Sequence, residues 1–296
     1  FEKEGHFDSR EYMSDLISEG QDQNRGWFYT LMVLSTAIFD KPAFKNVVCA
    51  GLILAPDGKK FSKRHGNGVS PLDLCDQYGS DAMRLYLTGS PAAHADSLLF
   101  DESKITEISG KYYQWLNAVK FFIEHTTKFQ KDGYTFDINA YKSSQNIMDR
   151  WILARLRTTL MNIEDHMSKY TFYKVKAEIL EFIEELINWY IKFNRNRLKG
   201  RFCDKVEQSQ ALSTLYRVLY QFTMITAPFA PFLAETFYQK LKVLSNHSEL
   251  SVHLCDYPKL EDFPENPVVE RQMKNLQNVS RIVRSLRMKS KYSTSA

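Results

Sequence analysis

The second half of the chain repeats apolar residues at helical spacing over three long stretches. In residues 152–167 and 175–190 an apolar side chain returns every three or four positions, and a third stripe begins at residue 212. This period places the apolar side chains on one side of a helix. The stretches therefore predict amphipathic helices that pack as a bundle. The residues of the stripes are Ile152, Leu156, Leu160, Ile163 and Met167; Val175, Ile179, Phe182, Ile183, Leu186 and Tyr190; and Leu212, Leu215, Tyr216 and Leu219.

The part of the chain before residue 100 carries a mixed pattern instead. Residues 27–39 are apolar over a length that suits a buried helix, and residues 44–55 form a β-branched run that predicts a buried strand. The sequence Pro-Asp-Gly at 56–58 predicts a turn, because proline presets φ and glycine tolerates the left-handed region. The order helix, strand and turn is typical of an α/β arrangement.

Two further helices are expected before residue 100. Ser70 and Pro71 have the composition of a helix start, with serine as the N-cap and proline in the first turn. Gly79 suits the end of that helix, and residues 80–87 begin the next one. The fold class predicted for the whole chain is therefore α/β followed by all-α.

Composition excludes several classes of protein. The chain has 296 residues, which suggests about two domains. Its net charge of +4 is a mild excess, and no apolar run reaches the roughly 18 residues that cross a bilayer. The four cysteines lie far apart and show no metal-ligand spacing, so we expect free thiols in the cytoplasm and no protein-bound metal. The chain begins with phenylalanine and ends in a polar tail, and we expect it to be a piece of a longer protein.

The stretch "GKKFSKRHGN" at residues 58–67 concentrates positive charge. Lys60 and Lys63 flank Ser62, and Phe61 is the one apolar residue among the charges. Such cations could hold a polyphosphate and stabilise the charge that develops on its oxygens. A solvated basic turn is the simpler interpretation of these residues taken alone.

The stretch "EGQDQNRGWF" at residues 19–28 combines carboxylates, amides and a large aromatic side chain before an expected helix. Glu19 and Asp22 could complement the helix dipole. With Gln23 they could also hold an amino group and ribose hydroxyls, while Trp27 walls an apolar pocket. Composition alone favours the first alternative.

A third candidate, "NWYIKFNRNRLKGRF" at residues 188–202, clusters cations and aromatic residues near the end of an expected helix. Lys192, Arg195, Arg197 and Lys199 could form a face that contacts phosphates. Cations at the C-terminal end of a helix also complement its dipole, and the residues do not decide between the two.

The order of these stretches resembles that of one enzyme family. The residues "KFSKR" at 60–64 resemble the KMSKS signature of class I aminoacyl-tRNA synthetases, with Phe61 in place of methionine and Arg64 in place of the last serine. "EGQDQNRGWFYTL" resembles the isoleucyl branch of that class. The resemblance continues through "YGSDAMRLYL", "DRWILARL" and "APFAPFLAE", so it covers nearly the whole chain. Taken as a whole, the sequence resembles the eukaryotic cytosolic type most.

This resemblance implies a fold and an organisation. The chain would hold the C-terminal half of a Rossmann-like catalytic domain, with the KMSKS loop, in residues 1–100. Connecting stem-contact helices and a linker would follow in residues 101–145. A helical-bundle anticodon-binding domain would occupy residues 146–257, and residues 258–296 would form a linker and the start of a basic C-terminal region.

The resemblance also implies roles for individual residues. The activity would be formation of an aminoacyl-adenylate from L-isoleucine and ATP, followed by transfer to tRNA(Ile), with Mg²⁺ brought in by the ATP. Phe61 would anchor the KMSKS loop by packing. The expected contacts are Lys60, Ser62 and Lys63 with ATP; Glu19, Gly20, Asp22, Gln23 and Trp27 with the aminoacyl-adenylate; and Lys192, Arg195, Arg197 and Lys199 with the tRNA.

Two features of the family are missing from the sequence. The 296 residues contain no His-x-Gly-His signature and no inserted editing domain, so we expect no isoleucine activation by this chain alone. Two alternatives remain open. The chain could come from a catalytically inactive tRNA-binding module derived from a class I synthetase, or from a valyl or leucyl relative.

Overall fold

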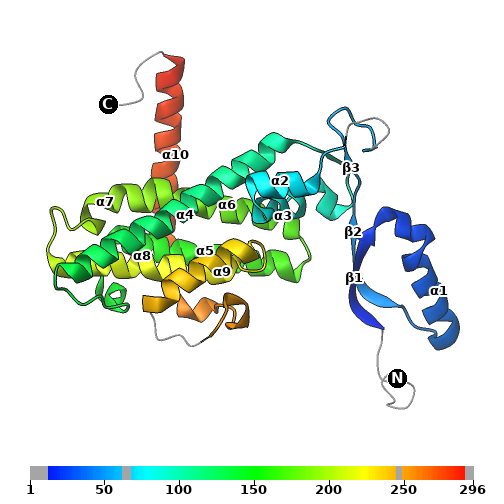
Figure 1. Cartoon of the computed structure of the whole chain (residues 1–296), viewed down its shortest axis with the longest axis horizontal. Coiled ribbons are helices and arrows are strands. Elements are labelled where there is room, and N and C mark those ends of the chain that lie inside the picture. The colour runs from blue at the N-terminus through cyan, green and yellow to red at the C-terminus, as the bar shows by residue number, and fades with distance from the viewer. Residues whose placement is uncertain (1–12, 62–67, 245–248, 291–296) are drawn as a thin grey trace. The chain divides into compact units, whose positions relative to one another are not determined.

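The computed structural model describes residues 13–61, 68–244 and 249–290, and it divides into two compact units. Unit 1 contains Phe1–Ser109 and Asp165–Ala177, and unit 2 contains Gly110–Glu164 and Glu178–Ala296. The long helix α4 (Glu102–Lys131) begins in the first unit and continues into the second from Gly110 (Figure 1). The division into four segments expected from the sequence stays a prediction.

Unit 1 is built around a parallel pair of strands. β1 (Ser14–Gly20) and β2 (Phe44–Ala50) are joined by α1 (Trp27–Phe39), which packs on the pair through Phe28 and Phe44 at a ring distance of 6.3 Å (Figure 1). A second, shorter parallel pair is formed by β3 (Ile53–Leu54) and β4 (Leu98–Leu99). These elements confirm the helix expected over residues 27–39 and a strand within residues 44–55.

The expectation that this helix and strand are buried is wrong for the described structure. In α1 only Phe28 and Ser35 are buried, whereas Ile38 is 65% exposed. No residue of β2 is buried. A helix that is apolar all round needs neighbours on every side, and a sheet of two strands covers only one of them.

The two short helices of unit 1 confirm the expected start and stop signals. α2 (Pro71–Tyr78) begins at Ser70, whose hydroxyl accepts a hydrogen bond from the amide of Asp73 at 3.3 Å. Gly79 ends the helix with a φ of 90°, a conformation that glycine adopts without steric cost. α3 (Ser80–Thr88) follows directly, and the 3-10 helix η4 (Pro91–His94) leads to β4.

Unit 2 is helical over almost all of its described length. The stripes in the sequence correspond to buried helix faces, except that Met167 is exposed. A π-helix at Leu186–Ile191 joins α6 to α7 without a break. The helices after α4 are α5 (Ile147–Ser168), α6 (Val175–Glu185), α7 (Lys192–Leu198), α8 (Lys205–Thr226), α9 (Pro231–Leu241) and α10 (Pro267–Lys289), and α5 and α6 each have one end in unit 1.

Aromatic rings fill the core of unit 2. The fully buried Trp115 lies 4.9 Å from the ring of Phe222 and 4.7 Å from that of Phe237. Phe182 packs against Phe222 at 4.6 Å. These contacts join α4, α6, α8 and α9, so one aromatic cluster holds four helices together. Among the described residues, no helix has the length and apolarity to cross a membrane.

Candidate functional site

The first candidate site lies where the strands of unit 1 end. Because β1 and β2 are parallel, their carboxyl ends meet at one edge, with Gly20 beside Ala50 and Glu19 beside Cys49. Ligands of open α/β sheets bind outside the carboxyl ends of the strands. The 3-10 helix η2 (Gln21–Arg25) starts directly at this edge, and α1 follows it (Figure 1).

Local hydrogen bonds arrange the side chains of this edge. The carboxylate of Glu19 accepts from the amide of Gly20 at 2.8 Å. The side-chain oxygen of Gln23 accepts from the amide of Trp27 at 2.9 Å, and its nitrogen donates to Asp22 at 3.3 Å. The five residues expected at the adenylate therefore lie on one short segment, from the end of β1 through η2 to the first residue of α1, and Trp27 is 45% exposed.

Gly20 has a packing role in this arrangement. A Cβ atom at Gly20 would lie 2.7 Å from Oδ1 of Asp22. A larger residue would therefore push the carboxylate of Asp22 away from its place. We refer to Glu19, Gly20, Asp22, Gln23 and Trp27 as the edge cluster.

A loop that sequence reasoning missed lies against this edge. Gln21 donates a hydrogen bond from its side-chain amide to the carbonyl of Ala95. A Cβ atom at Gly51 would lie 1.8 Å from the carbonyl oxygen of Asp96, so only glycine fits there. His94 pairs with Asp96 at 3.2 Å. The available signal was Gly51 itself, which directly follows the strand.

The described part of the basic stretch begins with a tight turn after β3. Lys60 forms an antiparallel bridge with Leu54. Within the turn that this bridge closes, the amide of Ala55 donates to the carbonyl of Lys59 at 2.8 Å, and Gly58 has a φ of 79°. The turn brings Lys60 back beside the strand at the start of the stretch.

Phe61 packs as the sequence predicts. Its ring meets the ring of Phe100 edge-on at 6.0 Å, and Phe100 in turn contacts Tyr86 at 5.8 Å. An aromatic contact therefore anchors the N-terminal part of the basic stretch, at Phe61. Ser62, Lys63 and Arg64 lie outside the described residues.

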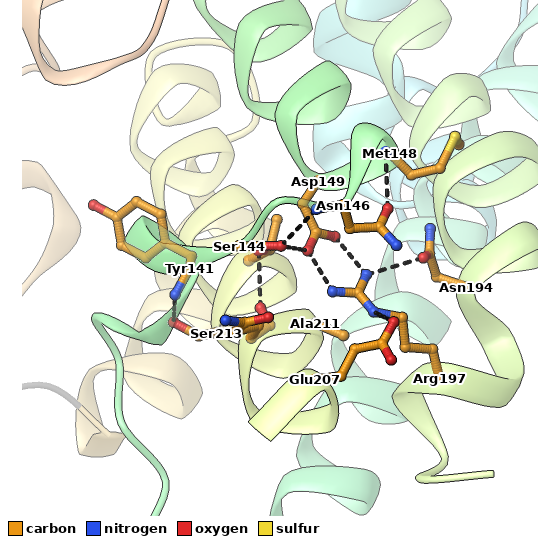
Figure 2. Close-up of polar contacts among 12 residues, drawn as sticks. Tyr141, Ser144, Asn146, Met148, Asp149, Asn194, Arg197, Glu207, Ala211 and Ser213 are labelled. Atoms are coloured by element: carbon orange, nitrogen blue, oxygen red, sulfur yellow. Dashed lines mark hydrogen bonds and ion pairs between the residues drawn. The ribbon is translucent and has the colours of Figure 1, made fainter. Parts of the chain in front are cut away.

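In unit 2 the structure separates the cations of residues 188–202 into two groups. Arg197 points into the unit and donates two hydrogen bonds to the buried carboxylate of Asp149, at 2.9 and 2.6 Å (Figure 2). It therefore differs from the expected surface contact with tRNA, because its guanidinium is buried and already bonded. Tyr190 and Ser144 donate to the same carboxylate at 2.7 and 2.5 Å.

The surroundings of this buried network favour the charged form of Arg197 and the protonated form of Tyr190. Burial opposes the charge on Arg197, but its hydrogen bonds to Asp149 outweigh this and raise its pKa. Burial raises the pKa of Tyr190 well above its usual value, and the negative charge of Asp149 adds to the effect. Tyr190 therefore stays protonated and donates to the carboxylate. Its hydroxyl, like that of Ser144, lies on the inside of the unit.

The remaining cations gather at the surface. Lys192 and Arg195 are exposed, and the Lys199 amine lies 6.0 Å from the centre of the Phe121 ring. His125 packs on the ring of Phe121, and burial lowers its pKa. The negative charge of Glu124 raises this pKa, whereas the positive charges nearby lower it further; these are Lys199, Arg195 and Arg201. These charges therefore act together on one region of unit 2.

A cavity in unit 2 carries charges that satisfy one another. Its volume is about 350 Å³, and Arg155, Glu181, Glu185 and Lys274 line it. Arg155 donates to Glu185 at 2.6 Å, and Lys274 donates to Glu181 at 2.7 Å. These pairs hold α5, α6 and α10 together. In the described ranges no group of three potential metal ligands occurs.

Comparisons with known proteins match both parts of the chain. Residues 149–296 match the family model of the anticodon-binding domain of tRNA ligase, and residues 2–98 match that of the class I tRNA synthetases (I, L, M and V). The cytoplasmic isoleucine–tRNA ligase of Schizosaccharomyces pombe is 41% identical over 285 residues, which are 93% of this chain and 27% of that protein. The enzyme of the same name from Arabidopsis thaliana is 39% identical, over 95% of this chain and 24% of its own length.

The chain thus spans about a quarter of the length of the curated relatives it matches. A LeuRS from Agrobacterium radiobacter K84, solved as a ternary complex with tRNA and LeuAMS, has a TM-score of 0.57. The match covers 84% of this chain and 29% of the LeuRS chain. At 19% sequence identity this similarity shows the fold alone. The fold class predicted from the sequence is confirmed. The chain belongs to the class I tRNA synthetases, and it joins part of their catalytic domain to their helical anticodon-binding domain.

Proposed function

We propose that this chain is part of an isoleucine–tRNA ligase that works in the cytoplasm. The observation that carries the proposal is the edge cluster at the carboxyl ends of β1 and β2, where two carboxylates, an amide and an exposed indole lie between the end of β1 and the start of α1. Its sequence resembles the isoleucyl branch of the family. The names of the similar ligases from Schizosaccharomyces pombe and Arabidopsis thaliana support the same amino acid and the same compartment.

In the proposed reaction the carboxylate of L-isoleucine attacks the α-phosphate of ATP, and pyrophosphate leaves. The terminal ribose of tRNA(Ile) then attacks the adenylate, and AMP leaves. Glu19 and Asp22 would hold the amino group and ribose hydroxyls, because ionised carboxylates accept several hydrogen bonds. Gly20 would let the backbone approach the adenylate, and Gln23 would hold the turn against α1 through Trp27.

Lys60 and Lys63 would bind the phosphates of ATP, with Ser62 between them and Mg²⁺ arriving as part of the substrate. Positive charge at that position stabilises the pentavalent transition state more than the bound ATP. Trp27 would line the pocket of the isoleucine side chain. Its 45% exposed ring leaves a large apolar surface for such a contact.

The exposed surface of α1 and β2 supports a larger catalytic domain around unit 1. We infer that further strands and helices of the complete protein cover this surface and complete the nucleotide site. The chain alone would then hold half of that site and would not activate isoleucine.

Unit 2 would bind tRNA(Ile) through the exposed Lys192 and Arg195 and the half-buried Lys199. Lys192, Arg195 and Lys199 remain in this role, while Arg197 holds the fold through Asp149. Contacts of this kind neutralise phosphates and release counterions, so the affinity would fall steeply with salt.

Charging of a tRNA(Ile) transcript with isoleucine by the complete protein tests the proposal. The proposal predicts charging that is lost in an Asp22→Ala variant while the variant still binds the transcript. Binding of the transcript with no charging by the unaltered protein would favour the alternative of an inactive tRNA-binding module.

A further inference from the structure

Unit 2 presents a stacked pair of aromatic rings beside its surface cations. Trp189 lies in the π-helix and Phe193 in the first turn of α7, with ring centres 5.6 Å apart and an angle of 25° between the ring planes. Phe193 is 65% exposed. A single exposed ring is ordinary, but a ring that stacks on a second ring among cations has the combination of groups that single-stranded nucleic-acid sites use.

We propose that Trp189 and Phe193 form a platform on which an unpaired base of the tRNA stacks, while Lys192 and Arg195 hold the neighbouring phosphates. The proposal rests on the tRNA binding proposed above. It adds the residues on which a base stacks, and it specifies that unit 2 selects an unpaired nucleotide.

The buried network of Asp149 fixes which way the platform faces. Arg197 bonds to Asp149 on the inside of the unit (Figure 2). Tyr190 donates to the same carboxylate, and Asn194 donates to the carbonyl of Tyr190 at 2.9 Å. These three positions define the inner face of the continuous helix. Trp189 and Phe193 lie one residue before Tyr190 and Asn194, so their rings flank that face, with Trp189 half-buried and Phe193 65% exposed.

The π-helix at Leu186–Ile191 contributes to this placement. Its wider turn shifts the residues that follow relative to an uninterrupted α-helix, and single turns of this kind recur at functional sites. Over this turn Trp189 and Phe193 stack at four-residue spacing, and Tyr190 reaches Asp149.

The charges around the platform favour nucleic acid over an apolar protein partner. Residues 186–203 contain no acidic residue and five cations, and the pairing of Arg197 with Asp149 leaves four. Asn188 and Asn196 are exposed on the same segment and can hydrogen-bond the edge of a base. Aromatic rings that stack on bases, with cations for the backbone, are the elements of single-stranded RNA recognition.

A paired stem cannot use such a platform, because both faces of its bases are already stacked. The proposal therefore distinguishes looped from fully paired RNA. Electrostatic contact alone would bind both in proportion to their phosphates.

Binding of a tRNA(Ile) transcript to the 296-residue chain, measured by fluorescence anisotropy over a salt series, tests the platform. Phe193→Ala should weaken binding by about 5- to 100-fold with an unchanged salt slope, since stacking carries no charge. Phe193→Tyr should restore binding. Phe232→Ala is the matched control, because Phe232 is 66% exposed on α9 and should leave the affinity unchanged.

Two comparisons separate stacking from charge. Arg195→Gln should flatten the salt slope by roughly 0.7–0.9, the value for one phosphate contact, whereas Phe193→Ala should not. A fully paired RNA duplex should bind the wild-type chain and Phe193→Ala equally. Circular dichroism checks that each variant keeps its helices.

Tryptophan fluorescence gives an independent readout. Trp115 and Trp151 are buried, so in a Trp27→Phe background Trp189 is the indole that stacked RNA can reach. The transcript should quench its emission, and the duplex should not.

The outcomes are distinct for the two levels of the proposal. Failure of the wild-type chain to bind the transcript at low salt would refute tRNA binding by unit 2. Normal binding by Phe193→Ala, or an equal loss of duplex binding, would refute the platform while tRNA binding stands.

Discussion

Replacement of Asp149 by alanine should destabilise unit 2 more than any surface change. Asp149 is 0% exposed and accepts four hydrogen bonds: two from Arg197, one from Tyr190 and one from Ser144. Removal of one partner of a buried ion pair costs about 3–5 kcal/mol, because the other charge stays buried without compensation.

Groups beside Arg197 decide where in this range the loss of unfolding free energy lies. The side-chain oxygen of Asn194 still accepts from Arg197 at 3.1 Å, and Glu207 lies 3.0 Å from its Nε atom and is partly exposed. These groups screen the charge that remains on Arg197. We therefore expect a loss of about 3–4 kcal/mol in the free energy of unfolding rather than the sum of four hydrogen bonds.

Urea unfolding of the chain, followed by tryptophan fluorescence, measures this loss. Trp151 lies two residues after Asp149 and is buried, so its emission reports on unit 2. The matched control is Asp132→Ala, which removes an exposed pair with Lys128 at 3.1 Å and should cost about 0–1 kcal/mol.

The reasoning would be refuted by a loss at Asp149→Ala no larger than that at Asp132→Ala. A double replacement, Asp149→Leu with Arg197→Met, should recover most of the stability, because apolar residues of similar size often substitute for a buried pair without loss. Asp149→Leu alone also fills the space left by the carboxylate, so recovery only when Arg197→Met is added would show that the charge of Arg197, and not the cavity, causes the cost.

Two further predictions concern the chemistry and the pH dependence. In the complete protein, Lys63→Ala should slow formation of the adenylate by about 10²-fold, because the charge of Lys63 acts on the transition state, while isoleucine binding changes little. Single-turnover kinetics measure the rate of adenylate formation. An effect limited to the KM for isoleucine would contradict this role of Lys63. Burial lowers the pKa of His125 in the folded chain, so the unfolded chain binds the proton more tightly. Stability should then be complete above the unfolded pKa of about 6.5 and decline as the pH falls below it. Thermal unfolding between pH 7.5 and 5.5 should show this decline reduced in His125→Gln, and identical pH profiles for the two proteins would count against it.

The helices of unit 2 are predictable from the sequence because each carries its own signal. The stripe from Ile152 to Ile163 has a clear period, and burial of that face confirms it. Ser70 and Gly79 mark the limits of α2 for local reasons of hydrogen bonding and φ. Such signals need no knowledge of distant residues.

The direction of individual side chains is harder to predict. Arg195 and Arg197 lie two positions apart and are chemically the same, yet one is exposed and the other is buried. Asp149, 48 residues away in the sequence, makes the difference. The π-helix adds to the problem, because its wider turn breaks the period from which a face would be predicted.

The edge cluster shows the same contrast in unit 1. Glu19 to Trp27 are contiguous, so their grouping can be predicted from the sequence alone. The loop with His94 and Asp96 joins them only because Gly51 allows a close approach of two backbones. The exposure of α1 was not predictable either, since it depends on how many strands lie beside it.

The central claim is that the complete protein activates isoleucine at the edge cluster. ATP–pyrophosphate exchange by the complete protein, measured with isoleucine, valine and leucine in parallel, tests this claim most directly. We predict exchange with the highest kcat/KM for isoleucine, and a large loss of that exchange in Asp22→Ala. A higher kcat/KM for valine or leucine, or exchange that Asp22→Ala leaves unchanged, would contradict the claim.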